Sequence, residues 1–182
     1  KALLRSPIVT VRDGKRVVDI QHWLDKVNGG EAPDYLLVIL GGNGVAVIRP
    51  EKIDEAIAKE VESARKLITY VRAACPKTRI GIAQAAGGSI EQIGWGKGYG
   101  AMTSAFQGNL NRILYDRTMM KLVEECGDQN IVFVPFSHNI DPVNAFPRER
   151  SNANALHGTA VSGFQAGDAL YAWLVNDLER QQ

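Results

Sequence analysis

The sequence predicts an α/β fold in which helices cover a parallel sheet. Short apolar runs alternate along the chain with longer segments of helical periodicity, which is the order of strand–helix units in such a sheet. The run at 35–40 is apolar at consecutive positions rather than at alternate ones, as expected for a strand buried on both faces. No repeats or low-complexity linkers interrupt this order. We therefore expect one domain over residues 1–182.

The chain is expected to open with a β-hairpin. Residues 8–20, IVTVRDGKRVVDI, contain two β-rich runs joined by Asp13-Gly14, a dipeptide that favours a tight hairpin turn. A short helix is predicted at 19–28, where apolar residues recur at helical spacing. Gly29-Gly30 end that helix, and the first buried strand follows at 35–40.

The rest of the chain continues the strand–helix alternation. A helix after Pro50 keeps an apolar stripe of about 3.6-residue period until Pro76 ends it. The later elements are predicted, in order, as a strand at 79–84, a helix at 104–126, a strand at 131–136 and a helix at 159–179. Such sheets usually have about five or six strands. The chain therefore looks like most of a domain without its first strand–helix unit.

Composition and charge exclude several classes of function. A formal net charge of +1, from 21 basic and 20 acidic residues, argues against nucleic-acid binding. No apolar run approaches the roughly 18 residues that span a bilayer, so no membrane partner is expected. Cys75, Cys126 and the three histidines are too scattered to indicate a metal site. We expect no metal or organic cofactor, and the sequence leaves the compartment open.

Three segments are expected at the carboxyl ends of the strands, where open parallel sheets bind ligands. They are Gly41–Gly44, the glycine-rich loop 85–103 and the loop 137–157. Asn43 lies on the first segment and His157 ends the third. An amide that donates to a developing oxyanion, together with an imidazole that moves a proton, suits acyl transfer. An alternative for Asn43 is a turn residue that hydrogen-bonds its own backbone.

Two stretches resemble signature blocks of the SGNH (GDSL-type) hydrolases. LLVILGGNGV resembles the third block, Gly-x-Asn-Asp after a buried strand, and NANALHGTAVSGF resembles the last block, Asp-x-x-His before a closing helix. CPKTRIGIA and IVFVPFSHNIDPVNAFP resemble the family's fourth and fifth strands with their flanks. The resemblance covers about residues 17–178 in the family's order. It implies a flavodoxin-like, three-layer α/β/α domain with a parallel sheet.

The resemblance also implies roles for individual residues. Asn43 takes the position of the side-chain oxyanion donor, with Gly41 and Gly42 shaping its turn. His157 takes the position of the general base. Asn154 stands where the family has the acid that orients this base. An Asn can accept a hydrogen bond from the imidazole, but it cannot stabilise the imidazolium, and the equivalent change in a serine protease costs about four orders of magnitude.

The chain departs from the family pattern in three places. It contains no Gly-Asp-Ser block, which holds the family's nucleophile and precedes the third block. Gly44 stands where the third block has Asp. In the last block, Asn154 stands in the position of the acid, and Gly158 replaces the usual Pro after the His. Ser89, in Gly-Gly-Ser, comes after the Asn block, which is the wrong order for the nucleophile, so a loop residue is the favoured interpretation.

Other polar and aromatic residues of the loops allow two interpretations each. Trp95 and Tyr99 are candidates for stacking on a sugar or acyl group at the rim. The glycine-rich run around them lacks the Gly-Lys-Ser/Thr ending of a phosphate-binding loop. His138 and Asp141 also follow a strand. Asp141 is either a substitute for the missing acid or, more simply, a turn residue before Pro142.

The sequence thus predicts a serine esterase or acylesterase whose Ser lies outside this chain. The substrate implied is a small ester or an acylated carbohydrate, without a choice between them. The alternative is a catalytically inactive SGNH-like binding or structural domain. A third possibility is the larger part of a truncated or processed enzyme. An absent central strand leaves an unpaired apolar edge, so we expect an N-terminal segment, another chain or self-association to complete the sheet.

Overall fold

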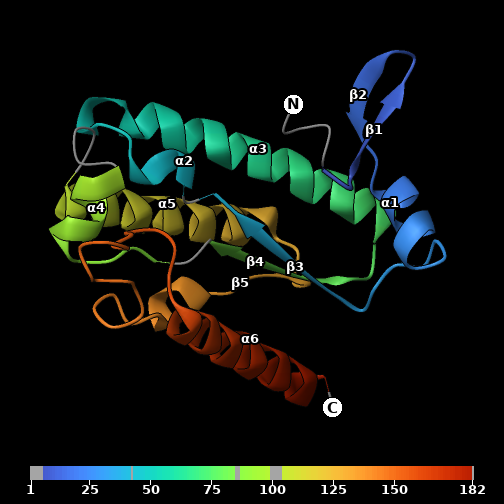
Figure 1. Ribbon diagram of the computed structural model, residues 1–182. Helices are drawn as coiled ribbons and strands as arrows, with labels where there is room; N and C mark the ends of the chain where they lie inside the picture. Colours follow the sequence, from blue (N-terminus) through green and yellow to red (C-terminus); the bar gives the residue numbers. More distant parts are fainter. Residues whose placement is uncertain (1–5, 42, 85–86, 99–103, 182) are drawn as a thin grey trace.

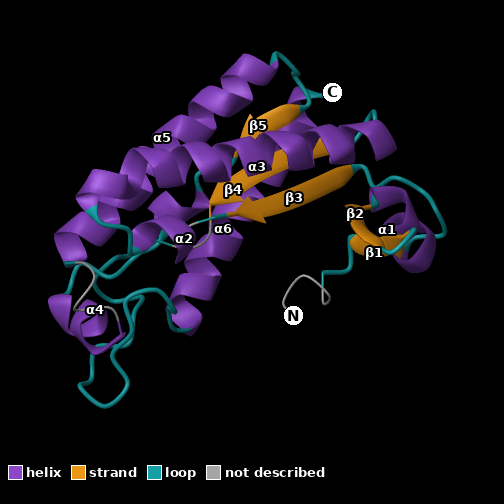
Figure 2. Cartoon of the chain, turned by 90° about the horizontal axis from the view of Figure 1, so that it is seen from above, coloured by secondary structure: helices purple, strands orange, loops and turns teal. Residues whose placement is uncertain are grey.

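The computed structural model of the protein describes residues 6–41, 43–84, 87–98 and 104–181 (Figure 1). A parallel sheet forms the middle layer, and helices cover both of its faces (Figures 1 and 2). Helices α3 (Ile53–Ala74) and α5 (Ala105–Cys126) lie on one face, and α6 (Ala160–Arg180) lies on the other. The predicted α/β fold with a parallel sheet is confirmed.

The sheet consists of β3 (Tyr35–Leu40), β4 (Arg79–Gln84) and β5 (Ile131–Phe133), in the order β3-β4-β5. Both pairings are parallel, so the three strands end at one edge of the sheet. β4 lies in the centre, and every residue after its first is buried. This burial explains why the sequence shows an unbroken apolar run there rather than an alternating one.

The third strand is shorter than the predicted 131–136. Pro135 has no N–H to donate to a ladder, and its ring fixes φ near −65°. Val134 still donates its N–H to the carbonyl of Ile82 at 2.7 Å, and a 3₁₀ turn at Phe136–Asn139 follows. The chain therefore turns away from the sheet three residues earlier than its apolar pattern indicates.

The N-terminal part forms a separate hairpin, β1 (Val9–Arg12) with β2 (Lys15–Val18), followed by α1 (Ile20–Val27). Asp13 and Gly14 have φ of 50° and 71°, the left-handed pair that the Asp-Gly dipeptide predicts. The carboxylate of Asp19 caps α1 by accepting the N–H of His22 at 3.0 Å. The predicted hairpin and helix are both present.

Two short helices were not predicted. α2 (Asn43–Ala46) follows β3, where the sequence indicated only a turn. α4 (Gln92–Gly98) lies within the glycine-rich segment that was expected to be a loop. Both are short and contain glycine, so their own helix propensity is low. Contacts with the rest of the fold, such as the burial of Trp95 in α4, stabilise them instead.

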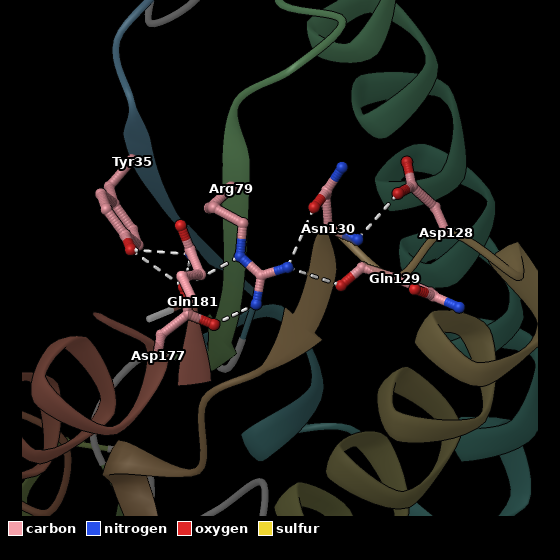
Figure 3. A network of polar contacts seen from close by, with 7 residues as sticks. All are labelled: Tyr35, Arg79, Asp128, Gln129, Asn130, Asp177 and Gln181. Carbon is pink, nitrogen blue, oxygen red and sulfur yellow. Dashed lines mark hydrogen bonds and ion pairs between the residues drawn. The ribbon is translucent and has the colours of Figure 1, made fainter. Parts of the chain in front are cut away.

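A polar network at the amino ends of the strands ties α6 to the sheet (Figure 3). The guanidinium of Arg79 donates to the carboxylate of Asp177, with Nε to Oδ2 at 2.9 Å. The same carboxylate accepts the hydroxyl of Tyr35 at 3.0 Å and the amide of Gln181 at 2.7 Å. Arg79 also donates to Asn130 Oδ1 at 2.9 Å, at the start of β5. One arginine thus joins β4 to α6 and to the segment that leads into β5.

Candidate functional site

The carboxyl edge of the sheet brings together the segments that carry the predicted site residues. α2 follows β3, the segment 87–98 follows β4, and a long loop between β5 and α6 returns across the same end of the molecule (Figure 1). One apolar cluster joins all three. Its buried members are Ala46, Trp95, Ala105, Ala155 and Leu156. Since Asn43 begins α2 and His157 follows Leu156, their two backbone segments lie against the same cluster.

Gly41 directly follows β3, whose last residue is Leu40. The φ of Gly41 is 65°, and a Cβ at this position would meet the side chain of Tyr115, which is only 1% exposed. The turn therefore needs a residue without a side chain, as the sequence indicated for the glycines around Asn43. Gly42 lies outside the described residues. Asn43 is described by its backbone, as the first residue of α2.

A buried amide on α5 holds α2 in place, and the sequence reasoning missed it. Asn111 is completely buried, and its Nδ2 donates to the carbonyls of Val45 at 3.0 Å and of Ile48 at 2.8 Å. These contacts satisfy carbonyl oxygens at the end of a four-residue helix, which is too short to be stable alone. Asn111 is thus a positioning residue for the segment that carries Asn43.

Replacing Gly41 with Ala should lower the free energy of unfolding by about 3 kcal/mol, because a left-handed backbone and a crowded Cβ add their costs. Gly44→Ala is the matched control. Gly44 lies in α2, and a Cβ there would meet only the flexible carboxylate of Glu60 at 3.3 Å. We expect that variant to stay within about 0.5 kcal/mol of the natural protein. Urea unfolding measures both, and equal losses would show that the turn at Gly41 is not constrained.

His157 and Asn154 are held in one turn, but not by the predicted contact. Asn154 Oδ1 accepts the backbone N–H groups of Leu156 at 2.9 Å and of His157 at 2.8 Å. The oxygen expected to accept from the imidazole is thus used by the backbone, since short amide side chains readily bond to N–H groups two and three residues ahead. His157 itself is exposed. Asn154 shapes the turn that presents His157 and does not orient its ring.

Trp95 is a core residue and offers no face for stacking. Its side chain is completely buried, and Nε1 donates to the carbonyl of Ser89 at 2.7 Å. The indole packs so closely on Gly88 and Gly108 that a Cβ on either would collide with it. The expected stacking role of Trp95 is therefore wrong, because the ring is what packs α4 onto α5. Tyr99 lies outside the described residues.

Ser89 is a structural loop residue, in agreement with the favoured interpretation. It is 3% exposed, and its Oγ accepts the N–H of Glu91 at 3.1 Å. Its own N–H donates to the carbonyl of Ala155 at 2.9 Å, which ties the loop after β4 to the segment before His157. The hydroxyl thus serves a local turn.

A second polar cluster lies at the ends of β4 and β5. His138 Nε2 lies 2.8 Å from Asp116 Oδ2, and the side chain of Asp116 is only 4% exposed. In its hydrogen-bonding orientation, the amide of Gln84 donates to both oxygens of this carboxylate, at 2.5 and 2.7 Å. Burial raises the pKa of Asp116, and the contact with His138 opposes this rise. The acid that faces His138 is therefore Asp116 on α5.

Asp141, the possible substitute for the acid missing from the last block, is engaged within its own turn instead. Its carboxylate accepts the N–H of Val143 at 2.8 Å and two donors of Asn144, and these contacts, led by the Asn144 side chain, lower its pKa. It is the turn residue of the simpler interpretation.

Within the described ranges, no three His, Cys, Asp or Glu side chains are grouped as metal ligands. No helix in these ranges combines the length and apolar character needed to cross a bilayer.

Comparison with solved structures shows what kind of protein shares this fold. A family two carbohydrate esterase from Clostridium thermocellum, solved in complex with cellohexaose, is 19% identical with a TM-score of 0.53. The match covers 83% of this chain and 38% of that one. A candidate platelet activating factor from Streptococcus pneumonia is 17% identical with a TM-score of 0.54, over 85% of this chain and 66% of that one.

The fold is one that a carbohydrate esterase uses. No family model and no curated protein matches the sequence. The chain spans less than two thirds of each solved structure that it matches. At these identities the likeness concerns the fold, and it agrees at that level with the esterase resemblance of the sequence.

Proposed function

We propose that this chain is part of an SGNH-type ester hydrolase that acts on a small ester or an acylated carbohydrate. The observation that carries the proposal is the meeting of two segments at the carboxyl edge of an esterase-like sheet. Ala46 of α2 and Leu156 share one buried cluster, which brings the segments of Asn43 and His157 together although 114 positions separate the two residues. This edge is where open α/β sheets bind ligands.

In the proposed reaction, a Ser outside this chain attacks the ester carbonyl. His157 takes the proton of the Ser hydroxyl and later returns it to the leaving alcohol. The amide of Asn43 donates a hydrogen bond to the oxygen that becomes negative in the tetrahedral intermediate. Water then hydrolyses the acyl-enzyme with His157 acting in the same way. No step requires a metal or an organic cofactor.

An acylated carbohydrate is one of two substrate classes under this proposal. One solved structure with this fold is a carbohydrate esterase in complex with cellohexaose, which supports a sugar as the alcohol part. A small soluble ester fits the same chemistry. Parallel assays with acetylated xylan and with p-nitrophenyl acetate distinguish the two classes.

The competing proposal is a catalytically inactive domain that keeps the fold for binding or structure. The contact of Asn154 favours it, because this side chain bonds to the backbone, and among the described residues no carboxylate is seen to bond to the ring of His157. Gly44 in place of an acid favours it as well. A protein without esterase activity on any acetylated substrate would support this alternative.

We further propose that another segment or chain completes the sheet beside β3. Among the described residues, β3 pairs only with β4, and Ile39 near the end of β3 is 52% exposed. An N-terminal segment, a second protein or self-association would cover this edge, since unpaired apolar strands template further pairing. Sedimentation of the isolated chain and of the full-length protein separates self-association from cover by an added segment.

His157→Ala in the full-length protein should lower kcat for p-nitrophenyl acetate by about 10²–10⁴-fold, because the proton-transfer group is removed. His22→Ala is the control, since His22 lies on α1, at the other end of the molecule (Figure 1). This control should turn over substrate at the rate of the natural protein. Equal rates for His157→Ala and the natural protein would reject His157 as the base.

A further inference from the structure

The buried carboxylate of Asp116 has several hydrogen-bond partners, although the proposed serine reaction does not use it. It lies on the buried side of α5 and accepts from Gln84, from His138 and, at 3.5 Å, from the hydroxyl of Ser137. Arg112 is one turn away on the same helix and is 4% exposed. Burial lowers the pKa of Arg112 to about 10, so its guanidinium stays charged near neutral pH and favours the ionised carboxylate.

His138 is the partner of this carboxylate that reaches solvent. Its side chain is 55% exposed, whereas that of Asp116 is 4% exposed. With the carboxylate as acceptor, the proton of a neutral ring sits on Nε2, and Nδ1 holds the lone pair. A buried acid that fixes the tautomer of an accessible imidazole is the arrangement by which enzymes prepare a general base. In the part of the chain that the structure describes, no acid is seen to bond to the ring of His157, and Asn154 is bonded to the backbone.

The pair borders a small cavity at the carboxyl edge of the sheet. Its volume is about 280 Å³. Arg112, Asp116 and His138 are the charged or titratable groups among its described lining residues. Ile113, Ile140 and Pro142 supply apolar surface. With about 30 Å³ for each water in the liquid, a space of this size holds an ester group together with several waters.

Two glycines of the segment after β4 also line the cavity. They are Gly87 and Gly88, and each is closely packed. A Cβ on Gly87 would lie 3.1 Å from the carbonyl oxygen of Ser137, and one on Gly88 would lie 2.9 Å from the indole of Trp95. Neither position has room for a side chain, so this part of the lining is held close to Ser137 and Trp95.

We propose that Asp116 and His138 form a water-activating pair, which hydrolyses small esters in this cavity without the Ser and without His157. Nδ1 of His138 takes a proton from a water, and the water oxygen bonds to the ester carbonyl carbon. The tetrahedral intermediate collapses by breaking the carbon–oxygen bond to the leaving alcohol. The imidazolium returns its proton to that alcohol, so the products are a carboxylic acid and an alcohol. Asp116 orients the ring and stabilises its charged form.

This activity goes beyond the proposed serine mechanism, and variants of the full-length protein separate the two. In a His157→Ala background the serine route is lost, and hydrolysis of p-nitrophenyl acetate by the pair should remain. Adding His138→Gln should lower this remaining rate by about 10²-fold or more, because Gln can keep a hydrogen bond to Asp116 but cannot transfer a proton. Adding His22→Ala instead should leave it unchanged.

Two further readouts separate proton transfer from a structural role. The remaining rate should fall as pH is lowered, because protonated imidazole is not a base, and Asp116→Asn should lower kcat more than it changes KM.

Several results would overturn the inference. A His157→Ala protein with no rate above that of buffer would reject the pair and leave the serine mechanism standing. A His138→Gln addition that keeps the rate, with urea unfolding unchanged, would reject His138 as the base. Activity that remains in each single variant and is lost in the double variant is the result expected if both routes operate.

Discussion

Asp177→Ala should lower the free energy of unfolding at pH 7 by about 2–3 kcal/mol, since it removes one partner of a mostly buried ion pair. Asp177 is 5% exposed and accepts from Arg79, Tyr35 and Gln181 (Figure 3). Its loss leaves three donors without this acceptor. The expected loss is at the low end for such pairs, because the Arg79 side chain is 22% exposed and keeps its contacts with Gln129 and Asn130.

Urea unfolding at pH 7 measures this loss, and Asp168→Ala is the matched control. Asp168 lies on the same helix, α6, and is exposed. We expect its replacement to change stability by less than about 0.5 kcal/mol. Equal effects of the two variants would mean that the network at the amino ends of the strands does not hold α6 to the sheet.

The same pair makes stability depend on acid pH. The hydrogen bond from Arg79 is the largest cause that lowers the pKa of Asp177 below its ordinary 3.8. A lowered pKa means that the unfolded chain binds the proton more readily, so this contribution is fully present above about pH 5 and is lost as pH falls through the folded-state pKa. Asp177→Asn should therefore lose less stability than the natural protein between pH 5 and pH 2, as measured by urea unfolding across this range.

The long elements could be predicted from the sequence because local signals agree with tertiary burial. β3 and β4 occupy the predicted ranges, and α5 begins within one residue of the expected position. The Ser104 hydroxyl accepts the N–H of Gln107 at 3.1 Å, and Gly127 ends α5 with φ of 62°. Such caps can be read from a single sequence, since their chemistry lies within one turn of the helix.

The short helices and the second polar cluster could not be predicted in the same way. α2 depends on Asn111, and α4 depends on burial of Trp95, so both are set by contacts across the fold. Asp116 and His138 are 22 positions apart, and nothing in the local sequence joins them. One signal was present, because Arg112 and Asp116 fall on the helical positions of α5 that are otherwise buried. Polar residues on a buried stripe are a reason to look for a partner.

The predicted catalytic residues show the limit of a resemblance. Motif order placed Asn43 and His157 on segments that do meet at one edge of the sheet. It could not show how Asn154 is used, because one amide oxygen serves either an imidazole or two backbone N–H groups. The backbone conformation at Ala155 and Leu156 brings the N–H groups of Leu156 and His157 to the amide oxygen of Asn154, and this conformation cannot be read from the motif.

Trp95→Ala should have the largest effect on stability of any substitution considered, a loss of about 4 kcal/mol in the free energy of unfolding. The indole is completely buried, and removing it leaves a cavity beside Gly88 and Gly108, which have no side chains to fill it. The carbonyl of Ser89 also loses the N–H that it accepts at 2.7 Å. Phe106→Ala is the control, since Phe106 lies on α5 with 76% of its surface exposed, and we expect it to cost less than about 0.5 kcal/mol.

Trp95→Phe separates packing from ligand contact at this position. Phe fills most of the space but cannot donate to Ser89, so we expect a loss of about 1–2 kcal/mol. At a temperature where this variant is fully folded, KM for an ester should stay at its natural value, because the ring has no exposed surface to offer a substrate. A raised KM with unchanged urea unfolding would mean instead that Trp95 leaves the core and stacks on the ligand. In that case the indole would no longer pack against Gly88.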